Sequence, residues 1–279
     1  MPRLQLSLDE LRERALFVRR DIVTLLARAQ SGHSGGPLSS ADFGTALFFH
    51  EMDVNPERLD DPSRDLWHFS IGHVTPVIYA LMAERGYFPL ADLLGFRQFK
   101  GHLQGHPSKH DTPGIEVSSG SLGQGLSVCC GMAYGSRFDK NPRRVYCVMG
   151  DGEQQEGQIW EAAMFAAHHQ LSNLVVIVDQ NGQQALGHTS EVLDLSPLEN
   201  RWRAFGWDTR VVDGHDVGAL VETVRAINTR SGPPRILIAR TVFGAGVSYM
   251  RGQVKWHYLP MSEEEYQRAM IEVTGSPPQ

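Results

Sequence analysis

Two neighbouring chain segments end in oxygen-bearing side chains that could hold a metal ion. An apolar run over residues 145–149 is followed by Gly150 and Asp151, and the next apolar run, over 174–178, is followed by Asn181. Both runs are typical of buried strands of a parallel sheet, and residues 157–170 between them have helical spacing. Because the carboxyl ends of neighbouring parallel strands lie at one edge of a sheet, we expect Asp151 and Asn181 to lie beside each other.

The chemistry of these side chains favours a metal bound to a phosphorylated ligand. Mg2+ takes about six oxygens and usually keeps substrate phosphates in its shell. A carboxylate, an amide oxygen and a backbone carbonyl supply about half of that shell, and a diphosphate beside small glycines could supply the rest. The tripeptide ending at Gly152 could equally be a strand-to-helix turn in which Asp151 caps the helix, and the tripeptide alone does not separate these interpretations.

Histidines and glycines gather in several further turns. Of the 12 histidines, several lie in Gly- or Pro-flanked turns over residues 31–36, 70–73 and 101–107, which we expect at helix entrances. A single histidine of this kind is more often a hydrogen-bonded structural residue than a functional one, but three such turns favour a site. The glycine-rich turn over 120–125 precedes a helix of small residues, and it indicates either close approach to a ligand or tight helix packing.

Composition bounds the class of protein. With 279 residues, 41% hydrophobic and 21% charged, the chain can form one large α/β domain, which we place over residues 1–279. A net charge of −6 gives no basic field for nucleic acid or an anionic membrane, and no apolar run reaches the length of a transmembrane helix. The charged N-terminus does not resemble a secretory signal. The 3 cysteines do not make a disulfide framework, so we expect reduced thiols and a cytoplasmic protein.

The order of elements predicts the fold class. Strands over 210–212 and 235–240 with a helix over 217–227 between them continue a β-α-β pattern, which predicts a doubly wound, mostly parallel sheet with helices on both faces. An N-terminal helix should begin at a capping box of Ser7 and Glu10. Ligands of such sheets bind at the carboxyl ends of the strands, where Asp151 and Asn181 fall.

The segment from Gly150 to Asn181 resembles the thiamine diphosphate fingerprint of Gly-Asp-Gly followed by a distant Asn, and residues from roughly 7 to 270 resemble transketolases. The resemblance implies a thiamine diphosphate-binding fold. It also implies thiamine diphosphate and Mg2+ as cofactors, with Ca2+ or Mn2+ as alternative metals. The metal ligands implied are Asp151, Asn181 and the backbone carbonyl of Gln183, with Gly150 and Gly152 against the diphosphate.

The resemblance also implies the other site residues. The histidines that match the active-site channel of transketolases are His33, His73, His106 and, in a less similar segment, His257. Those expected at the cofactor are His73, Gly120, Ser121, Leu122, Asn181 and His257, together with Glu156, which matches a glutamate at the subunit interface of the family. Ser34 and Ser121 stand where many members have proline, and neither change removes an expected ligand.

The expected function is that of an N-terminal subunit of a split transketolase. Such an enzyme transfers a two-carbon ketol unit from a ketose or ketose phosphate to an aldose. The pyrimidine-binding and C-terminal domains of the family have no counterpart here, so we expect them on a second subunit in a heterotetramer with two copies of each chain. An acyloin-forming enzyme of specialised metabolism, a 2-oxo-acid dehydrogenase alpha-type subunit and a noncatalytic regulatory subunit remain alternatives. Deoxyxylulose-phosphate synthase is disfavoured because it carries both domains on one chain.

Overall fold

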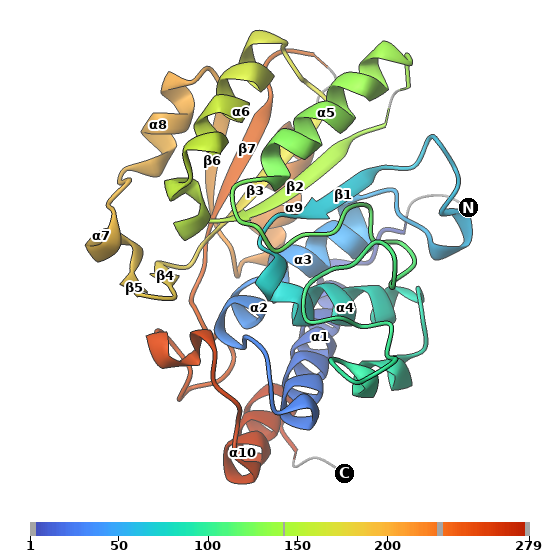
Figure 1. The fold of residues 1–279 in the computed structure, drawn as a ribbon, viewed down its shortest axis with the longest axis vertical. Helices are drawn as coiled ribbons and strands as arrows, with labels where there is room; N and C mark the ends of the chain where they lie inside the picture. The colour runs from blue at the N-terminus through green and yellow to red at the C-terminus, as the bar shows by residue number, and fades with distance from the viewer. Residues whose placement is uncertain (1–3, 142, 228–230, 277–279) are drawn as a thin grey trace.

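A parallel β-sheet between two layers of helices lies at the centre of the structure, a computed structural model that describes residues 4–141, 143–227 and 231–276 (Figure 1). Within these residues the sheet has 5 parallel strands in the order β1-β2-β3-β7-β6. Its strands are β1 (Leu66–Phe69), β2 (Val145–Gly150), β3 (Leu174–Gln180), β7 (Arg235–Arg240) and β6 (Asp208–Asp213). The predicted fold class is confirmed, whereas the predicted domain limits, 1 and 279, lie outside the described residues.

Alternate residues of the central strands enter two separate cores. On β3, Val175 and Ile177 pack into one core, and Val176 and Val178 pack into the other. Both sides of the strand are therefore covered, which explains the unbroken run of β-branched residues that marked it in the sequence. In the register between β2 and β3, Gly150 pairs with Asp179, so both strands end at the same edge.

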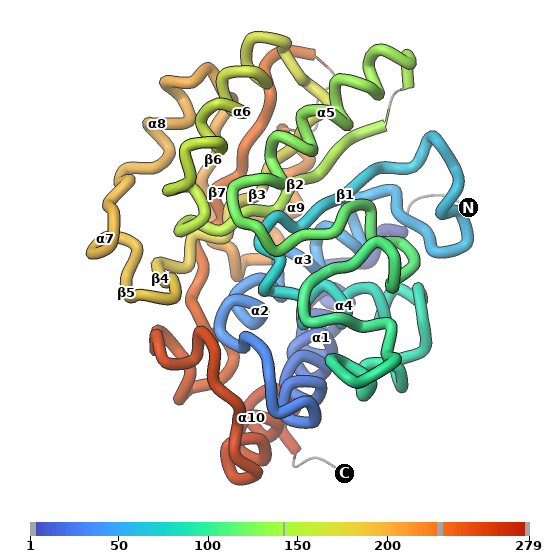
Figure 2. Tube along the Cα trace, in the orientation of Figure 1, coloured from blue at the N-terminus to red at the C-terminus, as the bar shows by residue number. Residues whose placement is uncertain are grey.

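The helices divide between the two faces, and the chain path is easiest to follow in Figure 2. One core is closed by α5 (Gly125–Phe138), α6 (Gly157–His168) and α8 (Leu198–Ala204). The other is closed by α1 (Leu8–Ala29), α3 (Ala41–Ala46), α4 (Thr75–Arg85) and α9 (Val217–Ile227), and α10 (Glu263–Thr274) packs against α1. The shorter elements are α2 (Gly35–Ser39), α7 (Thr189–Val192), a hairpin of β4 (Gln183–Gln184) and β5 (Gly187–His188), a π-helical turn (Leu47–Glu51) and 3₁₀ turns at Pro56–Arg58, Gly72–Val74, Leu90–Gly95, Gly152–Gln155 and Val254–His257.

The predicted start of α1 is confirmed in detail. The Ser7 backbone N–H donates to the Glu10 carboxylate at 2.7 Å, and the Ser7 hydroxyl accepts from the Glu10 N–H, which is a complete capping box. The apolar stripe of this helix, including Leu11, Val18 and Ile22, is buried in the core. No helix of the described residues is long and apolar enough to cross a membrane.

The differences from the sequence predictions are local. The predicted strand 210–212 is part of the longer β6, and the helix predicted to reach residue 170 ends at His168. The expectation that all three histidine turns lie at helix entrances is wrong for residues 101–107. They belong to a long connection without regular helix or strand, well before α5 begins at Gly125. Loop residues are often brought to functional sites by the elements that flank them.

Candidate active site

Asp151 and Asn181 lie together at the carboxyl edge of the sheet, one residue past β2 and β3 respectively, and both line a cavity of about 200 Å³. The backbone N–H of Gly182 donates to the Asp151 carboxylate at 2.7 Å, which ties the two strand ends directly. The other Asp151 oxygen accepts from the Gly152 N–H at 2.9 Å. Asp151 thus also caps the 3₁₀ turn that follows, so the two interpretations of the tripeptide are compatible.

The Asp151 carboxylate is buried. Among the described residues, no cationic side chain forms an ion pair with it. Its pKa is raised to about 7: burial is the largest cause, the hydrogen bond from Gly182 opposes it, and the nearby Asp179 adds to the rise. Burial disfavours the charged form of a carboxylate, and the backbone N–H groups that bond to Asp151 offset this only in part. A bound divalent cation would supply the missing charge, and on this ground the residues present fit a metal site.

Asp179 fixes the orientation of Asn181. It is 1% exposed and accepts hydrogen bonds from the hydroxyls of Ser39 at 2.6 Å, Ser40 at 2.8 Å and Thr241. The Asn181 amide nitrogen also donates to it, at 3.3 Å. The amide oxygen of Asn181, which accepts from the Gln183 N–H at 3.0 Å, is therefore the atom left for a further ligand.

A metal at this place would rest on mixed oxygen ligands. Among the described residues there is no group of three or more His, Cys, Asp or Glu side chains placed to hold a metal. The set suggested by the sequence contains a single carboxylate, an amide and a backbone carbonyl, which is suited to Mg2+ with phosphate oxygens completing the shell. Gln183 is buried, and its side-chain nitrogen lies 2.9 Å from the His188 ring.

The glycine-rich turns form the walls around this cavity. Gly150, Gly152, Leu122 and Glu156 line it, and Glu156 is exposed at its edge. A Cβ on Gly72 would lie 2.7 Å from the backbone nitrogen of Gly120, so the turn that carries His73 can meet the 120–125 turn only through glycine. Gly120 and Ser121 are exposed. Glu153 is buried beneath the 120–125 turn and accepts from the N–H of Gly123 at 2.8 Å.

Four histidines from distant segments form one cluster beside the cavity. The ring of His33 lies 4.9 Å from that of His73, 5.2 Å from that of His257 and 6.4 Å from that of His106, centre to centre. His73 and His257 are 5.2 Å apart and also line the cavity with Asp151. The four histidines suggested by the sequence are thus neighbours in space, including His257, whose segment resembled the family least.

The pKa of every imidazole in the cluster is lowered. The pKa of His33 and that of His73 are each lowered to about 3, mainly by burial and in smaller part by the neighbouring imidazoles. Burial also lowers the pKa of His106 and His257, and the charge of Arg97 adds to the effect on His106. A neutral imidazole offers one hydrogen-bond donor and one acceptor, and it can take up a proton from a hydroxyl. Such a row suits a ligand with several hydroxyl groups.

A series of contacts, from Phe243 through Val242 and His215 to Asp42, supports His257 from behind. Phe243 stacks on His257 with an interplanar angle of 3°, and a Cβ on Gly35 would lie 2.0 Å from the Phe243 ring. The N–H of the preceding residue, Val242, donates to His215 at 2.8 Å, and the other ring nitrogen of His215 lies 2.7 Å from Asp42.

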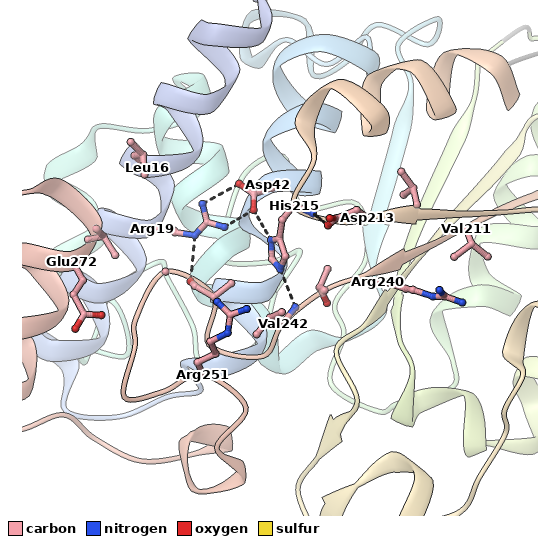
Figure 3. A pocket seen from close by; sticks show the side chains of 15 residues that line it. Leu16, Arg19, Asp42, Val211, Asp213, His215, Arg240, Val242, Arg251 and Glu272 are labelled. Carbon is pink, nitrogen blue, oxygen red and sulfur yellow. Dashed lines mark hydrogen bonds and ion pairs between the residues drawn. The ribbon is translucent and has the colours of Figure 1, made fainter.

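Arg19, Asp42, His215 and Val242 line a second, open cavity of about 820 Å³. Figure 3 shows the hydrogen bonds that connect them. Arg19 donates to Asp42 at 2.9 Å, and this bond links α1 to α3. Each ring nitrogen of His215 already has a partner, Asp42 on one side and the Val242 N–H on the other. His215 therefore holds the segment after β7 in place.

Several residues of the site were not identified from the sequence. Asp179 is the next-to-last residue of β3, two residues before Asn181, so a carboxylate at the strand end was a usable signal. Others come from separate elements and have no local pattern: Ser39, Ser40, Arg97, Thr241, Phe243 and Tyr258. Arg97 and Tyr258 stand at the outer side of His33, where the Tyr258 ring is 4.8 Å from the imidazole.

Comparison with known proteins agrees with this geometry. The family model described as "Transketolase, thiamine diphosphate binding domain" matches residues 13–278. The chain is 38% identical over 269 residues to one subunit of the apulose-4-phosphate transketolase of Actinobacillus succinogenes, covering 96% of this chain and 97% of that protein. It is 37% identical over 264 residues to one subunit of the 6-deoxy-6-sulfo-D-fructose transketolase of a Clostridium species, covering 95% and 96%.

A solved structure shares the fold. Transketolase from Campylobacter jejuni superposes with a TM-score of 0.91 at 29% identity, and the match covers 98% of this chain and 44% of that longer chain. The metal-competent strand ends, the four-histidine cluster and these matches agree. The chain belongs to the transketolase family and comprises its thiamine diphosphate-binding domain.

Proposed function

We propose that this chain is the N-terminal subunit of a split transketolase, which transfers a two-carbon ketol unit from a ketose to an aldose. The observation that carries the proposal is the cluster of four histidines with lowered pKa values beside the cavity of Asp151 and Asn181. Similar chains named as transketolase subunits act, by their names, on apulose-4-phosphate and 6-deoxy-6-sulfo-D-fructose. These names support a sugar or sugar phosphate as substrate.

The strand ends would hold the metal and diphosphate. Asp151, Asn181 and the Gln183 carbonyl would be the protein ligands of Mg2+, with Asp179 fixing the Asn181 amide. Gly150 and Gly152 leave room for phosphate oxygens beside the backbone. The turn of Gly120, Ser121 and Leu122 would lie against the organic part of the cofactor.

The histidines would bind the substrate and move its protons. When bound, thiamine diphosphate supplies the nucleophilic carbon and the electron sink that breaking a carbon–carbon bond requires. His73 and His257, at the cavity, would orient the carbonyl end of the sugar. His33 and His106, farther out, would bind its hydroxyls, and an uncharged imidazole can accept the proton that a hydroxyl loses during cleavage. The same imidazole can return that proton in the reverse step, in which the two-carbon unit is joined to the acceptor.

The partner would complete the site. We propose a second subunit with the pyrimidine-binding domain, in a heterotetramer with two copies of each chain and with Glu156, exposed at the cavity edge, at their interface. The family relatives of similar length that are named as subunits support this arrangement. A cytoplasmic complex fits the three cysteines, which are all buried and unpaired.

Reconstitution tests the proposal. The purified chain is mixed with its partner, thiamine diphosphate and Mg2+, and ketose-dependent transfer to an aldose is measured. Transfer that requires both chains supports catalysis, whereas intact cofactor binding without transfer from any ketose would favour a noncatalytic regulatory subunit. Activity on a 2-oxo acid instead of a ketose would favour the dehydrogenase alternative.

A further inference from the structure

Three polar side chains form a tether at the outer side of the histidine cluster. The Tyr258 hydroxyl lies 2.9 Å from the Ser31 hydroxyl, and Arg97 donates to Tyr258 at 3.1 Å. Arg97 also donates to Ser31 at 2.6 Å, which closes a triangle of hydrogen bonds. The phenol ring is therefore fixed at its far end, although 48% of the residue is exposed.

Arg97 is itself held in place for this contact. Its backbone φ of 58° lies in the left-handed region, which residues other than glycine rarely adopt. Its N–H donates to the backbone carbonyl of Leu103 at 2.9 Å. A Cβ on Gly105 would lie 2.6 Å from the Arg97 Nε, so the glycine gives the guanidinium its space. The guanidinium also lies 5.8 Å from the centre of the Tyr258 ring. These contacts hold the Arg97 guanidinium in position to bond to Tyr258.

The order of the rings defines an inner and an outer end. His73 and His257 line the cavity with Asp151, and His33 contacts both of them. Tyr258 meets His33 edge to face, with ring centres 4.8 Å apart. A sugar that reacts at the cavity and extends past His33 thus meets Tyr258 next.

We propose that Tyr258 is a specificity-determining residue whose tethered ring limits the length of the sugar chain that the site accepts. This inference rests on the proposed function and deepens it. A free tyrosine could turn aside for a longer substrate, whereas this ring cannot move without breaking its bonds to Ser31 and Arg97. The site should therefore favour short acceptors over extended ones.

The test uses the assembled enzyme and a series of aldoses, glyceraldehyde, erythrose and ribose. We expect Tyr258→Ala to raise the kcat/KM for ribose relative to glyceraldehyde by about tenfold, since one carbon unit of misfit in a pocket changes kcat/KM by about 10- to 200-fold. Tyr258→Phe keeps the ring and removes the tether, so its ratio of kcat/KM for ribose to that for glyceraldehyde should lie between the ratios of the wild type and Tyr258→Ala. Arg97→Gln should give a ratio similar to that of Tyr258→Phe. The matched control is Phe138→Ala, another exposed aromatic, at the end of α5. An unchanged length profile in Tyr258→Ala would overturn the inference.

A binding measurement separates this inference from the proposed function. Saturation-transfer NMR reports binding of glycerol, erythritol and ribitol, which lack the carbonyl that the reaction needs. A shift of binding toward ribitol in Tyr258→Ala supports the length limit even if the wild type transfers no ketol unit. The same binding profile in both proteins refutes the length limit even if the transfer reaction is observed.

Discussion

The half-buried histidine His73 should make folding stability depend on pH in a defined direction. Its pKa is about 3 in the folded chain, because burial and the neighbouring imidazoles oppose its charge, and about 6.5 in an unfolded chain. Between these values the unfolded state binds a proton that the folded state does not. Stability must therefore fall as pH falls below about 6.5.

The size of the effect follows from the unfolded state. At pH 5.5 an unfolded histidine is about 90% protonated, which favours the unfolded chain by about 1.4 kcal/mol relative to pH 7.5. The result does not depend on the folded pKa as long as that pKa lies well below 5.5. Burial raises the pKa of Asp21 and Asp151 to about 7, and these carboxyls act in the opposite direction, so the comparison needs a variant.

Urea unfolding of the wild type and of His73→Asn from pH 5.5 to 7.5 measures this contribution. The wild type should lose about 1.4 kcal/mol more than the variant over that range. A matched control, His110→Asn, changes an exposed histidine outside the cluster and should keep the wild-type slope. Parallel curves for the wild type and His73→Asn would show that His73 is not held uncharged by its surroundings.

Three further predictions concern the supports of the site. Asp151→Ala should abolish Mg2+-dependent retention of thiamine diphosphate in calorimetry, since the site loses its carboxylate, and full retention would refute the metal assignment. Asp179→Asn should weaken Mg2+ affinity about 10- to 100-fold, as loss of an outer partner of a ligand does, and an unchanged affinity would show that Asp179 does not orient Asn181. His215→Leu leaves the Val242 N–H without its acceptor and should lower unfolding free energy by about 1 to 3 kcal/mol; equal urea midpoints would contradict this.

Local patterns were enough to predict the elements that carry the proposed metal ligands. The runs before Asp151 and Asn181 are unbroken and apolar, which is typical of parallel strands that are buried on both faces. Their strand character and their shared edge could therefore be predicted. The cap at Ser7 is equally local. By contrast, β1 is only 4 residues long and includes His68, which is too little pattern for a prediction from sequence.

Contacts made by the folded chain could not be predicted in this way. The hydroxyls on Asp179 come from the end of α2, the residue after it and the residue after β7, and no spacing in the sequence relates these positions. The family resemblance indicated four histidines. The placement of Tyr258 against His33, however, depends on how the loop that carries Tyr258 packs on the loop that carries His33. Side chains of this kind require the tertiary structure.

The most direct test of the central claim follows two labelled carbons. A ketose carrying 13C at carbons 1 and 2 is incubated with an aldose, both subunits, thiamine diphosphate and Mg2+, and the products are followed by NMR. A two-carbon transferase moves both labels together to the aldose, and the mixture made with Asp151→Ala moves neither. Labels that stay in the ketose with the wild-type mixture, or that leave separately, would contradict the proposed ketol transfer.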